Sequence, residues 1–328
     1  MYWSRKIIAC TGVVLGIASF AWHAALAGPN YPDRPIKLLV GFSAGGATDT
    51  TFRKLGELAS KQLGQPIIIE NKAGAGATLA PSTMAKNDAP DGYTIAAATA
   101  GLLRYPYMQK VDWDPIKDFT WITGLGGYSF GLAVNSDSPF KTMDDLIAYA
   151  KKNPGHVTIA TAGAGTTMHL LAEALAGMAG VEITHVGYRG SAEAGTAVLG
   201  GHAMATVDAV GTILPYSEAG KMRVLLSFDA QPSSWLPGVP TAKSLGYELV
   251  YPAPYGLVGP KGMSPAVVDK LYQAFKAAAD SDEYKQLLET LKQTEWQKAP
   301  ADYQQWAREF YVSERSLVER AKLLRQSN

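Results

Sequence analysis

Two glycine-rich loops contain the residues best suited to hold an anion. The first, Gly41–Thr48, lies between the apolar run Ile36–Val40 and a helical pattern that we expect to begin at Asp49, with Thr48 as its N-cap. The second, Ala162–Thr167, follows another apolar run and also precedes a helical pattern. The first N–H groups of a helix have no partner within it and form the positive end of its dipole. The pattern therefore predicts an anion pocket formed by both loops.

Four side chains of these loops and the helices after them could add specific contacts. Asp49 could contact a ligand amine or a bound water, or it could only favour the dipole of its helix. Thr166 and Thr167 cap the second helix, and their hydroxyls would also point to a bound anion. His169 lies in the first turn of that helix, where a structural hydrogen bond is the alternative to a ligand contact.

Two further candidates lie after predicted strands. Ligands of open α/β sheets bind beyond the carboxyl ends of the strands, which adds the segment Thr99–Arg104 after the predicted strand Tyr93–Thr99. Arg104 stands in an otherwise apolar run, so either a second ligand carboxylate or an internal ion pair would explain it. Asp208 ends another predicted strand and could instead be a turn former. From these strand ends we expect Thr99, Gly101, Arg104 and Asp208 to face a ligand.

The segment Gly41–Gly45 also matches the G-x-S-x-G nucleophile elbow of α/β-hydrolases, with Ser43 as the nucleophile. Those enzymes need a histidine later in the chain. The last histidine here is His202, which leaves the final 126 residues without one. The elbow would also stand on the first predicted strand, without a preceding sheet to support it. An exported serine hydrolase is therefore the alternative function class, and we expect no catalysis.

Other chemistries lack their motifs. Gly163-x-Gly165-x-x-Met168 has no third glycine of a dinucleotide fingerprint, and no P-loop lysine follows either glycine loop. The five histidines are not spaced as metal ligands. No stripe of basic residues suggests nucleic acid. We therefore expect no cofactor, no metal and no nucleic-acid partner.

Residues 1–27 have the features of an export signal. Arg5 and Lys6 precede an apolar stretch, and Ala25-Leu26-Ala27 has the small-x-small form of a cleavage site. Cys10 is the only cysteine and lies inside this segment, so the mature chain has neither disulfide nor thiol nucleophile. Because the segment contains no acidic residue, the remaining chain has 28 basic and 29 acidic residues. The sequence predicts an exported protein without a strong net charge.

The elements that position both loops form two α/β units. The two strands and the helix within Ile36–Glu70 predict a right-handed parallel βαβ unit. Phe119–Asn135 contains two β-like runs and is where we expect the chain to leave the first sheet, and Met222–Phe228 could carry it back. We predict one domain from residues 28–131 and 229–328, a second from 132–228, and a ligand cleft between them.

The same segments resemble those of the substrate-binding receptors of tripartite tricarboxylate transporters, also called the Bug family. The matching blocks, which occur in order along nearly the whole mature chain, include Y-P-D-R-P-I-K-L-L-V-G-F-S-A-G-G-A-T-D, I-I-I-E-N-K-A-G-A-G, G-A-G-T-T-M-H and G-V-P-T-A-K-S-L-G-Y. Ser43 departs from the proline that the family usually has. The resemblance implies a type II periplasmic binding protein, in which two α/β domains, hinged by two crossing strands, close on a ligand.

The resemblance also implies a role. One ligand carboxylate would be held by the two glycine loops, partly through ordered waters, and the protein would be a periplasmic monomer that delivers its ligand to the membrane subunits of a transporter. A ligand sensor for a signalling partner is an open alternative. The family binds di- and tricarboxylates, acidic amino acids, aromatic acids and some neutral compounds, so the ligand is not fixed. The residues implied are Phe42, Ser43, Gly45, Gly46 and Asp49 in the first loop, and Gly163, Gly165, Thr166, Thr167 and His169 in the second.

Overall fold

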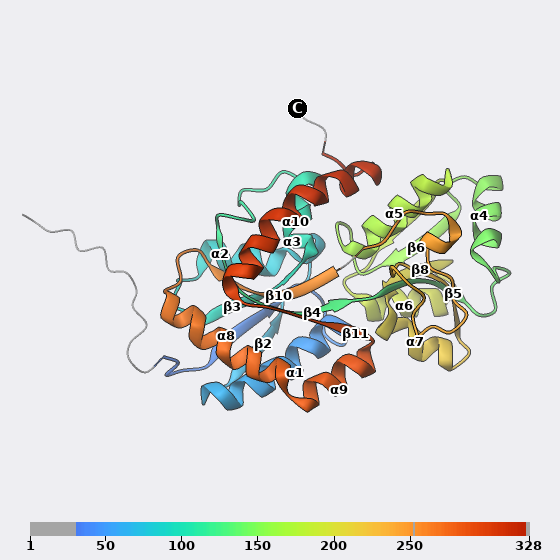
Figure 1. The fold of residues 1–328 in the computed structure, drawn as a ribbon. Coiled ribbons are helices and arrows are strands. Elements are labelled where there is room, and N and C mark those ends of the chain that lie inside the picture. The colour runs from blue at the N-terminus through green and yellow to red at the C-terminus, as the bar shows by residue number, and fades with distance from the viewer. Residues whose placement is uncertain (1–30, 252, 326–328) are drawn as a thin grey trace, which may run out of the picture.

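The computed structural model describes residues 31–251 and 253–325, which form two α/β units side by side (Figure 1). The predicted export signal, residues 1–27, lies outside this part. The first sheet has the order β11 (Gln293–Lys298), β4 (Phe119–Tyr128), β10 (Ala253–Pro260), β3 (Thr94–Thr99), β1 (Ile36–Val40) and β2 (Ile67–Asn71). The second has the order β7 (Ile183–Gly187), β6 (Val157–Thr161), β8 (Ala205–Ala209), β5 (Phe130–Asn135) and β9 (Met222–Ser227). This confirms the predicted two-unit α/β architecture.

Helices cover both faces of each sheet, which explains why the central strands are apolar on both sides. In β1, Ile36, Leu38 and Val40 pack towards one group of helices and Leu39 packs towards the other. The first sheet is covered by α1 (Ala47–Leu63), α8 (Pro265–Asp280) and α9 (Asp282–Leu291) on one face, and by α2 (Leu79–Asn87), α3 (Ala100–Met108) and α10 (Pro300–Arg320) on the other. The second is covered by α4 (Met143–Lys152) and α5 (Thr167–Ala179), and by α6 (Ser191–Leu199) and α7 (Val210–Glu218).

The opening βαβ unit is confirmed, but the start of its helix is not as predicted. β1 pairs in parallel with β2 and β3, and α1 is the crossover between β1 and β2. This helix begins at Ala47 with Gly46 as its N-cap, because Gly46 is extended and its carbonyl accepts the N–H of Thr50. The prediction that Thr48 caps a helix starting at Asp49 is therefore wrong. Thr48 lies inside the first turn.

Three elements were absent from the prediction. The segment after Thr99, expected as a loop, is the start of α3, and Thr99 is its N-cap. The helix α7 contains Gly211 and Pro215, whose low helix propensity conceals the helix in the sequence. The strand β11 is the polar run Q-T-E-W-Q-K, whose only pairing among the described residues is an edge contact with β4. Each element forms because tertiary packing overrides a weak local signal.

The chain leaves the first unit at a single residue. β4 ends at Tyr128 in the first sheet and β5 begins at Phe130 in the second, so Ser129 is the crossing. We propose Ser129 as the first domain boundary, in place of the predicted boundary after Gly131.

The second crossing lies further along the chain than Phe228. After β9, the N–H of Ala242 donates to the carbonyl of Ser227. The N–H of Tyr251 donates to the carbonyl of Phe228. Leu236 packs in the core beside α6 and α7. Residues 229–251 therefore stay on the second unit, and we propose that the return to the first unit follows Tyr251 instead of residue 228.

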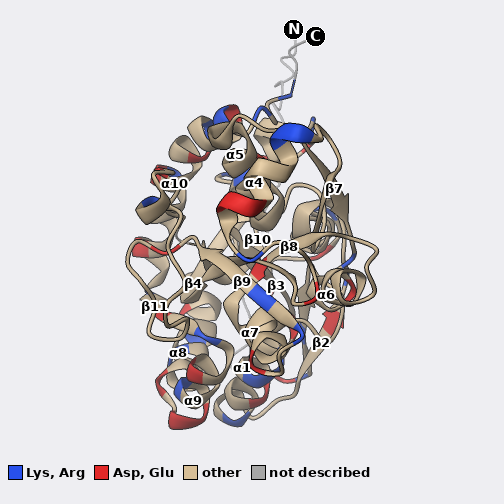
Figure 2. Ribbon diagram, turned by 90° about the vertical axis from the view of Figure 1, so that its right-hand side faces the viewer, with Lys and Arg blue, Asp and Glu red and all other residues tan. Residues whose placement is uncertain are grey.

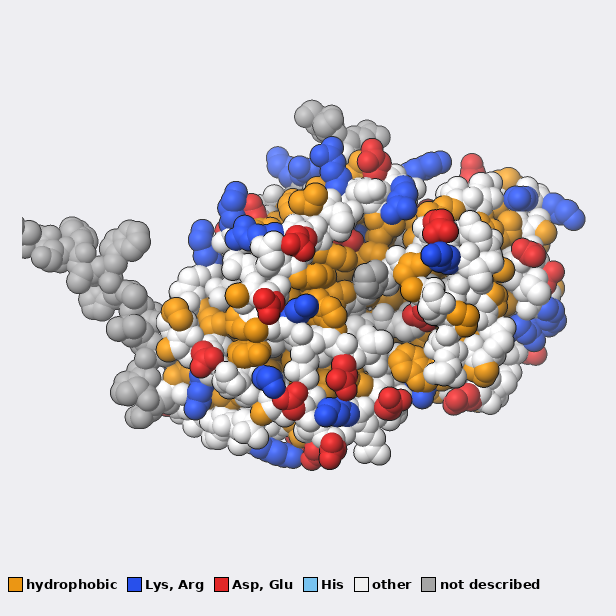
Figure 3. Space-filling view, in the orientation of Figure 1, with side chains coloured by type: hydrophobic (Ala, Val, Ile, Leu, Met, Phe, Trp, Pro, Cys, Tyr) orange, Lys and Arg blue, Asp and Glu red, His pale blue; other side chains and the backbone are white. Residues whose placement is uncertain are grey.

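The two units also touch away from the crossings. Helix α7 of the second unit meets α9 of the first, where a methyl group added at Gly211 would overlap the carbonyl oxygen of Leu291. On another side α10 packs against α5, and a methyl group at Gly177 would lie 3.5 Å from the carbonyl oxygen of Arg320. Hydrophobic side chains gather along the line between the units (Figure 3), whereas acidic and basic residues are interspersed over the face shown in Figure 2.

These two glycines give a matched test of the contact between the units. We expect Gly211→Ala to weaken the α7–α9 contact by roughly 1–3 kcal/mol, because the new methyl group has no space. The radius of gyration measured by small-angle scattering should rise. Gly177→Ala places a methyl group at the same boundary at an ordinary contact distance and should leave the radius unchanged. An unchanged radius in both variants would contradict the tight contact.

Candidate functional site

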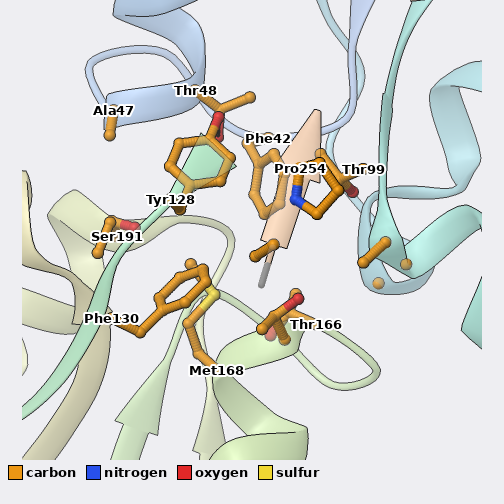
Figure 4. A pocket seen from close by; sticks show the side chains of 16 residues that line it. Phe42, Ala47, Thr48, Thr99, Tyr128, Phe130, Thr166, Met168, Ser191 and Pro254 are labelled. Carbon is orange, nitrogen blue, oxygen red and sulfur yellow. Dashed lines mark hydrogen bonds between the residues drawn. The ribbon is translucent and has the colours of Figure 1, made fainter. Parts of the chain in front are cut away.

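A cavity lies between the two units (Figure 4). Its most regular feature is that the starts of five helices contribute to its wall, two from the first unit and three from the second. Parallel strands end at the same edge of a sheet, which brings the helices that follow them to this edge. The contributing residues are Ala47 and Thr48 of α1, Thr99–Gly101 of α3, Thr166–Met168 of α5, Ser191 of α6 and Ala209, the N-cap of α7.

This convergence brings hydrogen-bond donors for an anion to the cavity. The first N–H groups of each helix lack a partner within the helix, and the helix dipole adds partial positive charge. None of the described lining residues has a charged side chain. The partial positive charge at this wall therefore comes from the backbone and not from side chains.

The rest of the wall is mostly apolar and aromatic. Phe42, Tyr128, Phe130, Met168 and Pro254 line the same space (Figure 4). The hydroxyl of Tyr128 donates to Thr48 Oγ1 at 2.9 Å, and burial raises the pKa of Tyr128, so this donor stays neutral. A ligand with a carboxylate and a compact apolar body would match such a wall.

Five of the predicted ligand residues line this cavity and nine do not. Those that do are Phe42, Thr99, Gly101, Thr166 and Thr167. Those that do not are Ser43, Gly45, Gly46, Asp49, Arg104, Gly163, Gly165, His169 and Asp208. Gly163 instead lines a neighbouring cavity of about 930 Å³ empty volume, on the other side of Gly76, which borders both.

Asp49 fixes the shape of the first loop. Its Oδ2 accepts hydrogen bonds from the N–H of Gly45 and from Nε of Arg53, both at 2.9 Å, and its Oδ1 accepts from Nδ2 of Asn71 at 2.8 Å. Burial alone would raise the pKa of Asp49, but these hydrogen bonds hold it below its usual value. The Gly45 N–H is thereby used inside the loop.

His169 has the structural role that was the alternative to a ligand contact. Its Nδ1 accepts the N–H of Gly165 at 3.1 Å, which holds the second glycine loop against the start of α5. Its ring stacks on that of His185, with the ring centres 3.8 Å apart. Burial, followed by the neighbouring His169, lowers the pKa of His185 to about 4, so His185 is neutral at pH 7.

Ser43 lies at a contact between the two units. Its N–H donates to the carbonyl of Arg189 at 3.4 Å, and its hydroxyl packs against Gly190. The two stacked histidines are bonded elsewhere, His169 to Gly165 and His185 Nε2 to Thr161 Oγ1 at 2.6 Å. No hydrogen bond joins Ser43 to a histidine among the described residues, so the arrangement is not that of a hydrolase nucleophile and base.

Arg104 does not reach the cavity, and its proposed contact with a second ligand carboxylate is wrong. Its side chain is fully buried and forms an ion pair with Glu314, with 2.7 Å between Nε and Oε2. Tyr251 completes the group by accepting from Arg104 Nη2 and donating to Glu314 Oε1. The internal ion pair is confirmed instead. Its acid lies 210 residues away, which is why no local acid was visible.

Five of the lining residues that the prediction missed fall into two kinds. Ser191 and Ala209 follow the strands β7 and β8, so the rule for strand ends, applied there as well, would have found them. Tyr128, Phe130 and Pro254 lie where the chain crosses between the units, and nothing in their local sequence marks them as cavity-lining residues.

Among the described residues, no group of three or more His, Cys, Asp or Glu could hold a metal ion. No helix in this part is long and apolar enough to span a membrane.

Comparison with known proteins identifies the family. The model of the tripartite tricarboxylate transporter family receptor matches residues 51–323. The chain belongs to this family. The sequence is 44% identical over 320 residues to the "UPF0065 protein in gbd 5'region" of Cupriavidus necator, covering 98% of this chain and 97% of that protein.

Solved structures agree with this assignment. The periplasmic binding protein BugD has a TM-score of 0.86 at 28% identity, over 90% of this chain and all of that one. MatC from Rhodopseudomonas palustris with bound malate has a TM-score of 0.82 at 28% identity, over 88% of this chain and 100% of MatC. R. palustris Rpa4515 with adipate has a TM-score of 0.83 at 27% identity, over 89% and 98% of the two chains. This Bug-type receptor is thus a periplasmic solute-binding protein and not an enzyme.

The buried Arg104 group yields a test of stability. We expect Arg104→Met to lower the free energy of unfolding by about 3–5 kcal/mol, because it leaves the buried Glu314 carboxylate without a cation. Lys86→Met is the control, since Lys86 pairs with Asp112 at the surface and such pairs contribute at most about 1 kcal/mol. Urea unfolding at pH 7 measures both. Equal losses in the two variants would show that the buried pair is not structural.

Proposed function

We propose that this receptor captures a small organic carboxylate in the cavity between its units and delivers it to the membrane subunits of a tripartite tricarboxylate transporter. The observation that carries the proposal is the convergence of five helix starts on one cavity without a charged side chain in its wall. Membership of the family supports the transporter partner. The structures of MatC with malate and Rpa4515 with adipate support dicarboxylates of four to six carbons as ligands.

The wall also bears on the charge of the ligand. A carboxylate taken out of water needs compensation by donors or cations. Helix starts supply partial charges and N–H groups, but no lysine or arginine among the described residues lines the cavity to neutralise a third carboxylate. The aromatic part of the wall favours a compact apolar spacer. We therefore favour acids with one or two carboxylates over tricarboxylates.

The proposal includes the location and state of the protein. The mature chain would begin after cleavage behind Ala27, act in the periplasm as a monomer, and close its two units around the ligand. Intact-mass measurement of the exported protein tests the cleavage site. Uptake of the identified acid, compared between intact cells and cells that lack either the receptor or the membrane subunits, distinguishes transport from sensing, since transport needs both whereas uptake does not require a sensor.

The ligand class can be tested with thermal shifts over a panel of mono-, di- and tricarboxylates. A ligand that binds only the native state raises the melting temperature by mass action. We expect Thr48→Val to reduce the affinity for each binding acid by roughly 10–100-fold, because one hydrogen bond to a charged group contributes about 1.5–3 kcal/mol. Thr196→Val, on the exposed side of α6, is the matched control and should bind normally. If no acid shifts the melting temperature, the carboxylate proposal fails.

A further inference from the structure

One wall of the cavity carries a hydroxyl that is bonded to a buried carboxylate. Ser191, at the first position of α6, lines the cavity on the side of Tyr128 and Phe130 (Figure 4). Its Oγ donates to Asp208 Oδ1 at 2.7 Å. Asp208 lies near the end of β8 with only 1% of its surface exposed. Asp208 thus stands directly behind the cavity wall.

The carboxylate of Asp208 is incompletely satisfied. Its Oδ1 also accepts the N–H of Ala209 at 2.7 Å, whereas its buried Oδ2 has no hydrogen-bond partner among the described residues. No described lysine, arginine or histidine forms an ion pair with it. Burial raises the pKa of Asp208 to about 6, against the hydrogen bonds from Ser191 and Ala209, so the group is mostly ionised above pH 7. Such a buried charge is costly for stability alone.

The ionised Asp208 fixes which way the Ser191 hydroxyl points. A hydroxyl has one proton, and Ser191 gives it to Asp208, so only its oxygen lone pairs are left for the cavity. Two other hydroxyls of the wall have the reverse polarity. Thr167 Oγ1 accepts from both terminal nitrogens of Arg104 at 3.4 Å, and Thr48 Oγ1 accepts from Tyr128, so these two hydroxyls keep their protons for a ligand.

We propose that the Ser191–Asp208 pair is a subsite for a hydrogen-bond donor on the ligand, a hydroxyl or an ammonium group close to a carboxylate. The first turn of α6 presents both N–H groups for the carboxylate and the Ser191 oxygen for the donor, which places the donor on the carbon beside that carboxylate. The receptor therefore prefers 2-hydroxy or 2-amino acids to the unsubstituted acid. This inference rests on the proposed capture of a carboxylate in the same cavity.

The preference follows from the cost of an unmatched polar group. A site built to hydrogen-bond a hydroxyl or amine rejects an analogue that lacks it, because the buried acceptor then loses its partner. Succinate, malate and aspartate form a suitable series, since they share two carboxylates and a four-carbon chain and differ in the substituent at carbon 2. We expect one enantiomer of malate or aspartate to bind about tenfold or more tightly than succinate.

The experiment is calorimetric titration of the three acids at pH 8, where Asp208 is ionised, with the wild-type protein and three variants. Ser191→Ala removes the acceptor and should bring the affinity ratio between substituted and unsubstituted acid close to one. Asp208→Asn keeps the shape but removes the charge that orients the hydroxyl, and should also reduce the ratio. Thr48→Val, the control at another hydroxyl of the wall, should weaken all acids while keeping the ratio. Unfolding curves without ligand verify that each variant is folded.

Each outcome decides the matter. A preference for the substituted acid that Ser191→Ala and Asp208→Asn abolish and Thr48→Val retains supports the subsite. If the three acids bind the wild-type protein equally, or succinate binds best, the subsite is wrong while carboxylate capture stands. A preference that survives in Ser191→Ala also overturns it, because another group must then accept the donor. If none of the acids binds, capture of small dicarboxylates fails together with the subsite.

Discussion

The cavity between the units is built around backbone N–H groups that have no hydrogen-bond partner within their own helices. Five helices, α1, α3, α5, α6 and α7, begin at one cavity, and each start presents N–H groups that its own helix does not use. The chain crosses twice between the units. The helix starts of both sheets therefore face one another across the boundary between them. The glycines around the cavity serve the same end. Gly76, at a φ of 61°, lies against the backbone of Gly165, so the units approach with little between them.

The buried Arg104 orients one of the hydroxyls around this cavity. Arg104 is paired with Glu314 on α10 and hydrogen-bonded to Tyr251 of the segment that returns to the first unit. The same guanidinium donates to Thr167 on α5. This one residue thus connects α3, α10, the second crossing and the wall of the site. Its buried position is stable because each of its strong donors meets an acceptor.

Site residues could be predicted from the sequence only where the pattern that marks them lies in neighbouring residues of the chain. Strand, glycine loop and helix start follow one another along the chain, so the loops at Gly41–Thr48 and Ala162–Thr167 and the candidates Thr166 and Thr167 could be predicted. Phe42 was implied only by the resemblance to the family. The two sheets could be predicted for the same reason. Tyr128 and Pro254 could not, since they come together only through the pairing of β4 with β10. The prediction that Arg104 contacts the ligand failed because its ion-pair partner, Glu314, lies 210 residues further along the chain.

Backbone donors alone explain why such a fold can bind many different carboxylate ligands. The side chains behind the wall explain how one carboxylate ligand could be selected over another. An N–H group at a helix start donates to any anion of suitable size. Discrimination between acids of similar charge requires groups whose hydrogen-bonding direction is fixed. In this chain the fixing groups are Arg104, which leaves Thr167 as a donor, and Asp208, which leaves Ser191 as an acceptor. Neither charge lines the cavity, yet together they give the neutral wall a donor side and an acceptor side. On this proposal, selectivity depends on residues outside direct reach of the ligand, because each buried charge acts through a hydroxyl.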